Sequence, residues 1–208
     1  MAVDRPAFSI MFVCTGNQCR SPMAERLARL AIGRHLGPDA ARFKVSSAGT
    51  GMYEGRPMTR ETATVLESYG ADPHRFRSTG LTLERIDAAD LILTATRAHR
   101  SQVVSLQPQA LQRTFTMTEF ARHAGAVTTP RSEGLAGGEA GGHDDPVARA
   151  CALVAEVARS RGSVPPARPE DDDIPDPIGR PLEVYRSVGS MIAAAVDASI
   201  AALAGVRV

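Results

Sequence analysis

The chain has 208 residues, of which 43% are hydrophobic, and this predicts one packed domain or one domain with an elaboration. The formal net charge of +1 excludes a bulk attraction to nucleic acid or to an anionic membrane. No apolar run approaches membrane-span length, the N-terminus lacks a signal-peptide apolar region, and the cysteine count of three favours a reducing cytoplasm over a disulfide scaffold.

Strands and helices are predicted to alternate from the first apolar run onward. Strands are expected at residues 8–13, 43–47, 90–94 and 113–115. Helices are expected at residues 21–36, 59–69, 83–87, 98–106, 118–123 and 181–203. Alternation of this kind indicates an α/β fold with a parallel sheet, and right-handed crossovers place helices on both of its faces.

Residues 124–172 differ in composition from the rest of the chain. They contain no aromatic side chain, are rich in Gly and Pro, and include one amphipathic helix over 146–161. We interpret them as a partly flexible insertion within a single domain spanning residues 1–208. Limited proteolysis is expected to cleave first within 128–142.

The loop after the first strand carries the residues most informative about function. A thiol at Cys14 and a guanidinium at Arg20 stand six residues apart, at a strand end and a helix start. The N–H groups of a tight loop and of a helix N-terminus bind a dianionic phosphate, and the same field stabilises a thiolate. An arginine grips two phosphate oxygens at once. Gly16 and Asn17 suit backbone with positive φ, and Ser21 can donate its hydroxyl to the sulfur. The alternative is that Cys14 is a packed apolar residue and Arg20 a surface charge.

Four segments together resemble the low-molecular-weight protein tyrosine phosphatase family, which includes thioredoxin-coupled arsenate reductases. The first segment is residues 13–25, Val-Cys-Thr-Gly-Asn-Gln-Cys-Arg-Ser-Pro-Met-Ala-Glu. The other three are residues 46–51, 89–93 and 173–177. The resemblance implies a four-stranded parallel sheet flanked by helices on both faces, in three layers. It places a phosphate loop at the C-terminal end of the first strand.

The resemblance also implies the roles of individual residues. Cys14 is the expected nucleophile, Arg20 the phosphate clamp and Asp176 the general acid. Substrate binding is expected from the loop, the residues that hold its shape, and an aromatic wall: Thr15, Gly16, Asn17, Gln18, Cys19, Ser21, Ser47 and Tyr53. The implied reaction is hydrolysis of phosphotyrosine in proteins through a phosphocysteine, with no metal and no cofactor. The expected partners are phosphotyrosine-containing proteins, among them a tyrosine kinase, or small phosphate esters. Inorganic phosphate and other oxyanions should compete with them for the phosphate loop.

Two Asp-Pro pairs compete for the general-acid role. Asp176 precedes Pro177, Gly179 and a strong apolar helix, which matches the family order, whereas Asp145 before Pro146 is more simply a helix cap. The run 171–173 is interpreted as a solvated charge run. Ile178 stands where family members often carry an aromatic, so the substrate cleft is expected to differ in shape.

Several alternatives remain open from the sequence. Cys19 is either a resolving thiol for Cys14, which the resemblance supports, or a packed small residue. Cys151 is interpreted as core packing, but it is also the one thiol outside the loop that an arsenate reductase relay would need. A non-catalytic phosphotyrosine or phosphate-binding module needs neither a thiolate nor an acid. The five histidines show no metal-ligand spacing, so surface or packing roles are expected of them.

Overall fold

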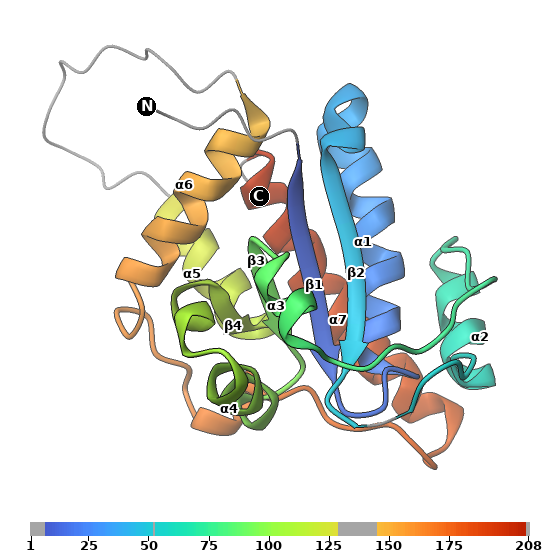
Figure 1. Cartoon of the computed structure of the whole chain (residues 1–208). Helices are drawn as coiled ribbons and strands as arrows, with labels where there is room; N and C mark the ends of the chain where they lie inside the picture. Colours follow the sequence, from blue (N-terminus) through green and yellow to red (C-terminus); the bar gives the residue numbers. More distant parts are fainter. Residues whose placement is uncertain (1–6, 52, 129–144, 207–208) are drawn as a thin grey trace, which may run out of the picture.

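The computed structural model describes residues 7–51, 53–128 and 145–206. Its centre is a parallel sheet in the order β2-β1-β3-β4 (Figure 1). The strands are β1 Phe8–Cys14, β2 Phe43–Gly49, β3 Leu91–Thr94 and β4 Thr114–Thr116. In β1, Phe12 stands opposite Ser47 of β2 and Leu93 of β3. The predicted fold class is confirmed.

Seven α-helices are described around this sheet. They are α1 Arg20–Leu36, α2 Arg60–Ser68, α3 Leu83–Asp87, α4 Arg97–Leu106, α5 Met117–Thr128, α6 Pro146–Arg159 and α7 Leu182–Leu203. Short 3-10 helices at Gly37–Arg42, Pro108–Arg113 and Pro169–Asp172 are additions to the predicted elements. Residue 124 lies inside α5, and most of the predicted protease-sensitive stretch, residues 129–142, lies outside the described residues.

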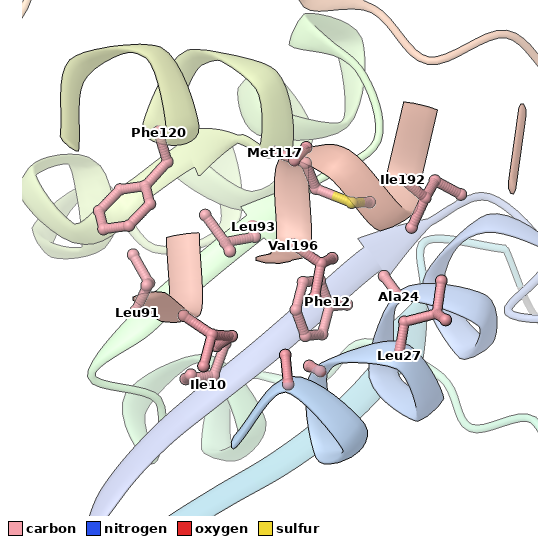
Figure 2. Close-up of a cluster of buried hydrophobic side chains, with 14 of the residues drawn as sticks. Ile10, Phe12, Ala24, Leu27, Leu91, Leu93, Met117, Phe120, Ile192 and Val196 are labelled. Carbon is pink, nitrogen blue, oxygen red and sulfur yellow. The ribbon is translucent and has the colours of Figure 1, made fainter. Parts of the chain in front are cut away.

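The two faces of the sheet carry separate hydrophobic clusters because side chains alternate along each strand. Ile10 and Phe12 of β1 point to the face covered by α1, α5 and α7, where they are almost fully buried (Figure 2). Met11 and Val13 point to the opposite face, into a smaller cluster with Ile86 of α3 and Val103 of α4. Burial on both faces fixes the register of β1, and therefore fixes where its C-terminal residue, Cys14, emerges.

Helix α7 departs from one sequence expectation. It is long and apolar enough to cross a membrane by length and composition, but 56% of its most apolar window is buried inside the protein. The helix packs against α1, α5, α2 and α6, so it has an apolar surface on most sides. Its exposed face carries Glu183, Arg186 and Ser190, so α7 is a core helix whose apolar residues are buried by these neighbours.

Candidate active site

The phosphate loop is the stretch 14–20, from the last residue of β1 to the first residue of α1. Asn17 has a φ of 49° and is buried at the centre of the loop. Its Nδ2 donates to Ser21 Oγ at 2.9 Å and to Ser47 Oγ at 2.8 Å, while its Oδ1 accepts from the Thr79 N–H at 2.8 Å. The side chain of Asn17 therefore ties the loop to the helix, to β2 and to the segment before α3.

The loop and the end of β2 approach each other closely. A Cβ on Gly49 would lie 2.7 Å from the Thr15 carbonyl oxygen and 3.1 Å from the Asn17 Cβ, so only glycine fits there. Gly16, in contrast, is not among the described residues with positive φ, and a Cβ there would meet ordinary contacts. The expectation of positive φ is thus confirmed for Asn17 and wrong for Gly16, because one αL residue is enough to reverse this loop.

The hydrogen bonds around Cys14 have a favoured direction. Ser21 Oγ already accepts a hydrogen bond from Asn17. Its own proton has two possible acceptors, Cys14 Sγ at 3.0 Å and the Ala48 carbonyl oxygen at 3.4 Å from Ser21 Oγ. The nearer acceptor is the sulfur, which is buried. A thiolate has no proton of its own and accepts such a bond better than a thiol. The arrangement therefore suits a nucleophilic sulfur at Cys14.

A buried carboxylate supports this network from behind. Glu25 of α1 is 5% exposed and accepts from Ser47 Oγ at 2.6 Å and from Arg29 Nη2 at 2.6 Å. Ser47 in turn accepts from Asn17. Glu25 is not among the predicted site residues, although it stands in the N-terminal motif, as a charged residue between the buried Ala24 and Leu27.

Arg20 is the last residue of the loop, and its guanidinium is buried. Its Nη1 donates to the Ile174 carbonyl at 3.2 Å, and its Nη2 donates to Asp176 Oδ2 at 2.6 Å and to Thr15 Oγ1 at 3.4 Å. The Nε of Arg20 is also buried and has no hydrogen-bond acceptor among the described residues. A buried donor without a partner costs free energy, so this side of the fork is suited to an oxyanion.

The segment that carries Asp176 is anchored at the carboxyl end of the sheet. Asp173 accepts from the Arg97 N–H at 2.7 Å, and the Ile174 N–H donates to the Ala95 carbonyl at 2.8 Å. Asp172 is 7% exposed and pairs with Arg122 at 2.5 Å. The interpretation of 171–173 as a solvated charge run is therefore wrong for Asp172 and Asp173, because arginines of α4 and α5 reach them.

Asp145, the competing acid, serves as a helix cap. Its carboxylate accepts from the N–H groups of Val147 and Ala148 at the start of α6 and pairs with Arg42. Asp176 is 45% exposed and in contact with Arg20. The structure thus brings Asp176, and not Asp145, to the phosphate loop.

The remaining predicted residues lie in the loop or against it. Tyr53 is 43% exposed and lies against the loop, with its Cδ2 3.8 Å from the Cβ position of Gly16. Gln18 holds the 57–59 segment, because its side-chain Nε2 donates to the Pro57 carbonyl at 3.2 Å and its backbone carbonyl accepts from the Thr59 N–H at 3.1 Å. Cys19 is a buried free thiol whose pKa is raised by burial. Cys151 of α6 is half-buried against the core.

His99 of α4 also belongs to the site, although it is not among the predicted site residues. Its Nε2 lies 2.8 Å from Thr15 Oγ1, and its Nδ1 lies 2.7 Å from Thr96 Oγ1. Burial, followed by the nearby charge of Arg20, lowers the pKa of His99 to about 4. The imidazole is therefore neutral at physiological pH. In the sequence, Thr96-x-x-His99 marks only the start of a helix, where Thr96 accepts from the His99 N–H; the contact with Thr15 arises because β3 pairs with β1.

Comparison with known proteins agrees with this geometry. A family model described as low molecular weight phosphotyrosine protein phosphatase matches residues 9–141. A protein-arginine-phosphatase of Geobacillus stearothermophilus is 28% identical over 91% of this chain and 92% of its own length. The low molecular weight protein-tyrosine-phosphatase PtpB of Staphylococcus aureus is 30% identical over 58% of this chain and 79% of its own. The solved low molecular weight protein tyrosine phosphatase of T. tengcongensis is 29% identical, with a TM-score of 0.62 over 92% of this chain and 97% of that one.

Proposed function

Because the chain belongs to the low molecular weight phosphotyrosine protein phosphatase family, we propose that it hydrolyses phosphotyrosine in proteins through a phosphocysteine intermediate. The observation that carries the proposal is the position of Cys14 Sγ, 3.0 Å from Ser21 Oγ in a loop that also holds Arg20. The substrates would be phosphotyrosine proteins of the cytoplasm, tyrosine kinases among them, or small phosphate esters.

The first chemical step would form an S–P bond and break the P–O bond to tyrosine. Cys14 Sγ attacks phosphorus in line with the phenolic oxygen, and the Asp176 carboxylic acid gives that oxygen its proton. The loop N–H groups and Arg20 stabilise the charge on the three equatorial oxygens. In the second step Asp176 takes a proton from water, the water oxygen attacks phosphorus, and the S–P bond breaks. Ser21 then donates its hydroxyl to the departing thiolate.

The contact between Arg20 and Asp176 has a consequence for substrate binding. The guanidinium cannot grip a phosphate with both sides of its fork while Nη2 is held 2.6 Å from the Asp176 carboxylate. A dianionic phosphate is the stronger partner for arginine in this pocket. Substrate would therefore displace Asp176 from Arg20 and free the carboxyl group to approach the leaving oxygen.

Phosphoarginine is a second candidate substrate. The relative from Geobacillus stearothermophilus is named a protein-arginine-phosphatase and aligns with 91% of this chain. The same nucleophile and the same clamp would serve a P–N bond. Ile178 follows Asp176-Pro177 and is 51% exposed, so a branched aliphatic side chain would border the leaving group.

Steady-state hydrolysis of a phosphotyrosine peptide and a phosphoarginine peptide of the same sequence tests the proposal. We expect the phosphotyrosine peptide to have the higher kcat/KM and Cys14→Ser to abolish turnover of both. Asp176→Ala should lower kcat about a hundredfold for phosphotyrosine, because a phenolate then leaves unprotonated. Asp145→Ala is the matched control and should keep wild-type kcat, since Asp145 caps α6.

Each part of the proposal has its own contradicting result. Turnover by Cys14→Ser would exclude the nucleophile, and an equal loss in both Asp variants would exclude Asp176 as the specific acid. A kcat/KM that is higher for the phosphoarginine peptide would identify phosphoarginine, not phosphotyrosine, as the preferred substrate. The assignment of Cys14 as the nucleophile would be unaffected.

A further inference from the structure

A hollow bordered by Glu25 lies outside the phosphate loop, because none of its lining residues belongs to the stretch 14–20. It has a volume of about 490 Å³ and lies between α1, the edge strand β2, α3 and the segment 72–79. Five of its 13 lining residues are arginines, namely Arg26, Arg29, Arg75, Arg77 and Arg85. The chain has 23 arginines in 208 residues, a share that would place one or two among 13. Composition alone therefore does not explain this concentration of positive charge.

The positive charge in the hollow is largely uncompensated. Within the described part of the chain, no carboxylate lies within ion-pair distance of Arg26, Arg75, Arg77 or Arg85. The carboxylates that line the hollow are Glu25, which is held by Arg29 and Ser47, and the exposed Asp72. Like charges held together disfavour the folded state, so such a cluster is expected where an anion binds.

Arg26 is held in place by a hydrogen bond, and Arg75 has an uncommon backbone conformation. Arg26 donates from Nη2 to the His74 carbonyl at 3.2 Å, while its Nε is buried and has no acceptor among the described residues. Arg75 has a φ of 56°, and the other described non-glycine residue with positive φ is Asn17 of the phosphate loop. A residue other than glycine in this region costs free energy, which is typical of functional positions.

We propose that this hollow is a second anion site, which binds a ligand carrying two phosphate groups. Guanidinium groups bind phosphate oxygens in pairs, and four of them suit two phosphates. The site is separate from the phosphate loop, and its ligand is not the substrate. The ligand is either a free oligophosphate or two phosphate groups on a protein segment.

The position of Glu25 decides which arginines can be tested. Glu25 borders the hollow, and it also holds Ser47, which accepts from Asn17 of the phosphate loop. Removing Arg29 would leave this buried carboxylate unpaired and would disturb the catalytic loop. Arg75, Arg77 and Arg85 are exposed, and within the described residues no hydrogen bond or ion pair joins them to Cys14, Arg20 or Asp176, so they are the positions to change.

The test is calorimetric titration of the full chain with pyrophosphate, in 150 mM salt and with saturating benzylphosphonate to occupy the phosphate loop. We expect one pyrophosphate per chain for wild type and at least a tenfold weaker affinity for the triple variant R75Q/R77Q/R85Q. The matched control R60Q/R159Q/R186Q removes three exposed arginines elsewhere and should bind as wild type does. All three proteins should hydrolyse phosphotyrosine peptide at the same rate without pyrophosphate, which verifies that they are folded.

A second arm uses a peptide with two neighbouring phosphoserines in place of pyrophosphate. Binding of the peptide alone would identify a phosphorylated protein segment as the ligand, and binding of pyrophosphate alone would identify a free oligophosphate. The site is excluded if neither probe binds wild type, or if R75Q/R77Q/R85Q binds as tightly as wild type. Because the readout is binding, this result does not depend on which substrate the phosphate loop hydrolyses.

Discussion

At the scale of single residues, hydrogen bonds between side chains hold the phosphate loop in shape. Thr15 shows this most clearly, because its hydroxyl lies between Arg20 Nη2 at 3.4 Å and His99 Nε2 at 2.8 Å. A neutral imidazole in this position holds Thr15 without adding a second positive charge next to Arg20. A protonated imidazole would be desolvated and would repel the guanidinium, which is why its pKa is low.

The state of His99 predicts a pH dependence of stability. Its pKa is about 4 in the folded protein and about 6.5 when exposed. Burial and Arg20 lower this pKa, while Asp176 and Asp173 oppose the shift without reversing it. As the pH falls, the unfolded chain therefore takes up the proton before the folded protein does. The stability that rests on a neutral His99 is complete above about pH 6.5 and is lost as the pH falls towards 4.

Urea unfolding of wild type and His99→Gln at pH 7.5 and pH 4.5 measures this effect. Between the two pH values wild type should lose about 2 to 3 kcal/mol more than the variant, because glutamine does not titrate. Carboxylates titrate over the same range in both proteins and cancel in the comparison. Equal losses in the two proteins would mean that His99 is not held neutral by the fold.

At the scale of elements, the strands and long helices could be predicted because their own patterns specify them. Phe8–Cys14 is apolar at every position except Ser9, and Gly37, whose φ is 50°, follows the last residue of α1. The 3-10 helices could not be predicted, because Pro and small polar residues fit a turn or a loop equally well. The sequence predicts a shorter helix than α5 for a similar reason, since Gly125 is a weak helix former and the packing of α5 on α7 supports the longer helix.

The contact of α7 with α2 predicts opposite effects for two glycine substitutions. A Cβ on Gly189 of α7 would lie 2.6 Å from Val65 Cγ1 of α2, and the branched valine cannot turn away. A Cβ on Gly33 of α1 would meet nothing within 4 Å. Gly189→Ala should destabilise the protein by about 1 to 3 kcal/mol through overpacking, whereas Gly33→Ala should stabilise it by about 0.5 to 1 kcal/mol.

Urea midpoints of the two variants against wild type check this prediction. Gly33→Ala is the matched control, because it makes the same chemical change in another helix. If both variants were stabilised to the same extent, α7 and α2 would not be in the close contact described here.

At the scale of the whole molecule, the site is built from residues that are far apart in the sequence. Arg20 and Asp176 are 156 residues apart in sequence, yet they are in contact at the C-terminal ends of the parallel strands. Cys14, Arg20 and Asn17 could be identified from sequence because they stand in one short motif. The roles of Glu25 and His99 could not, because they depend on partners from other elements, Ser47 and Thr15, that only the fold brings near.

This closure predicts that an active-site ligand stabilises the entire fold. We expect benzylphosphonate to bind with its phosphonate in the loop, and a ligand present at a hundred times its dissociation constant adds about 2.7 kcal/mol to the free energy of unfolding. Urea unfolding with and without benzylphosphonate should show this gain for wild type and for the hollow variant R75Q/R77Q/R85Q. Arg20→Lys should lose most of it at the same concentration, since an ammonium group cannot bind two oxygens as a fork does. A full gain in Arg20→Lys would mean that the phosphonate binds elsewhere, and a loss confined to the hollow variant would move the binding site to the hollow.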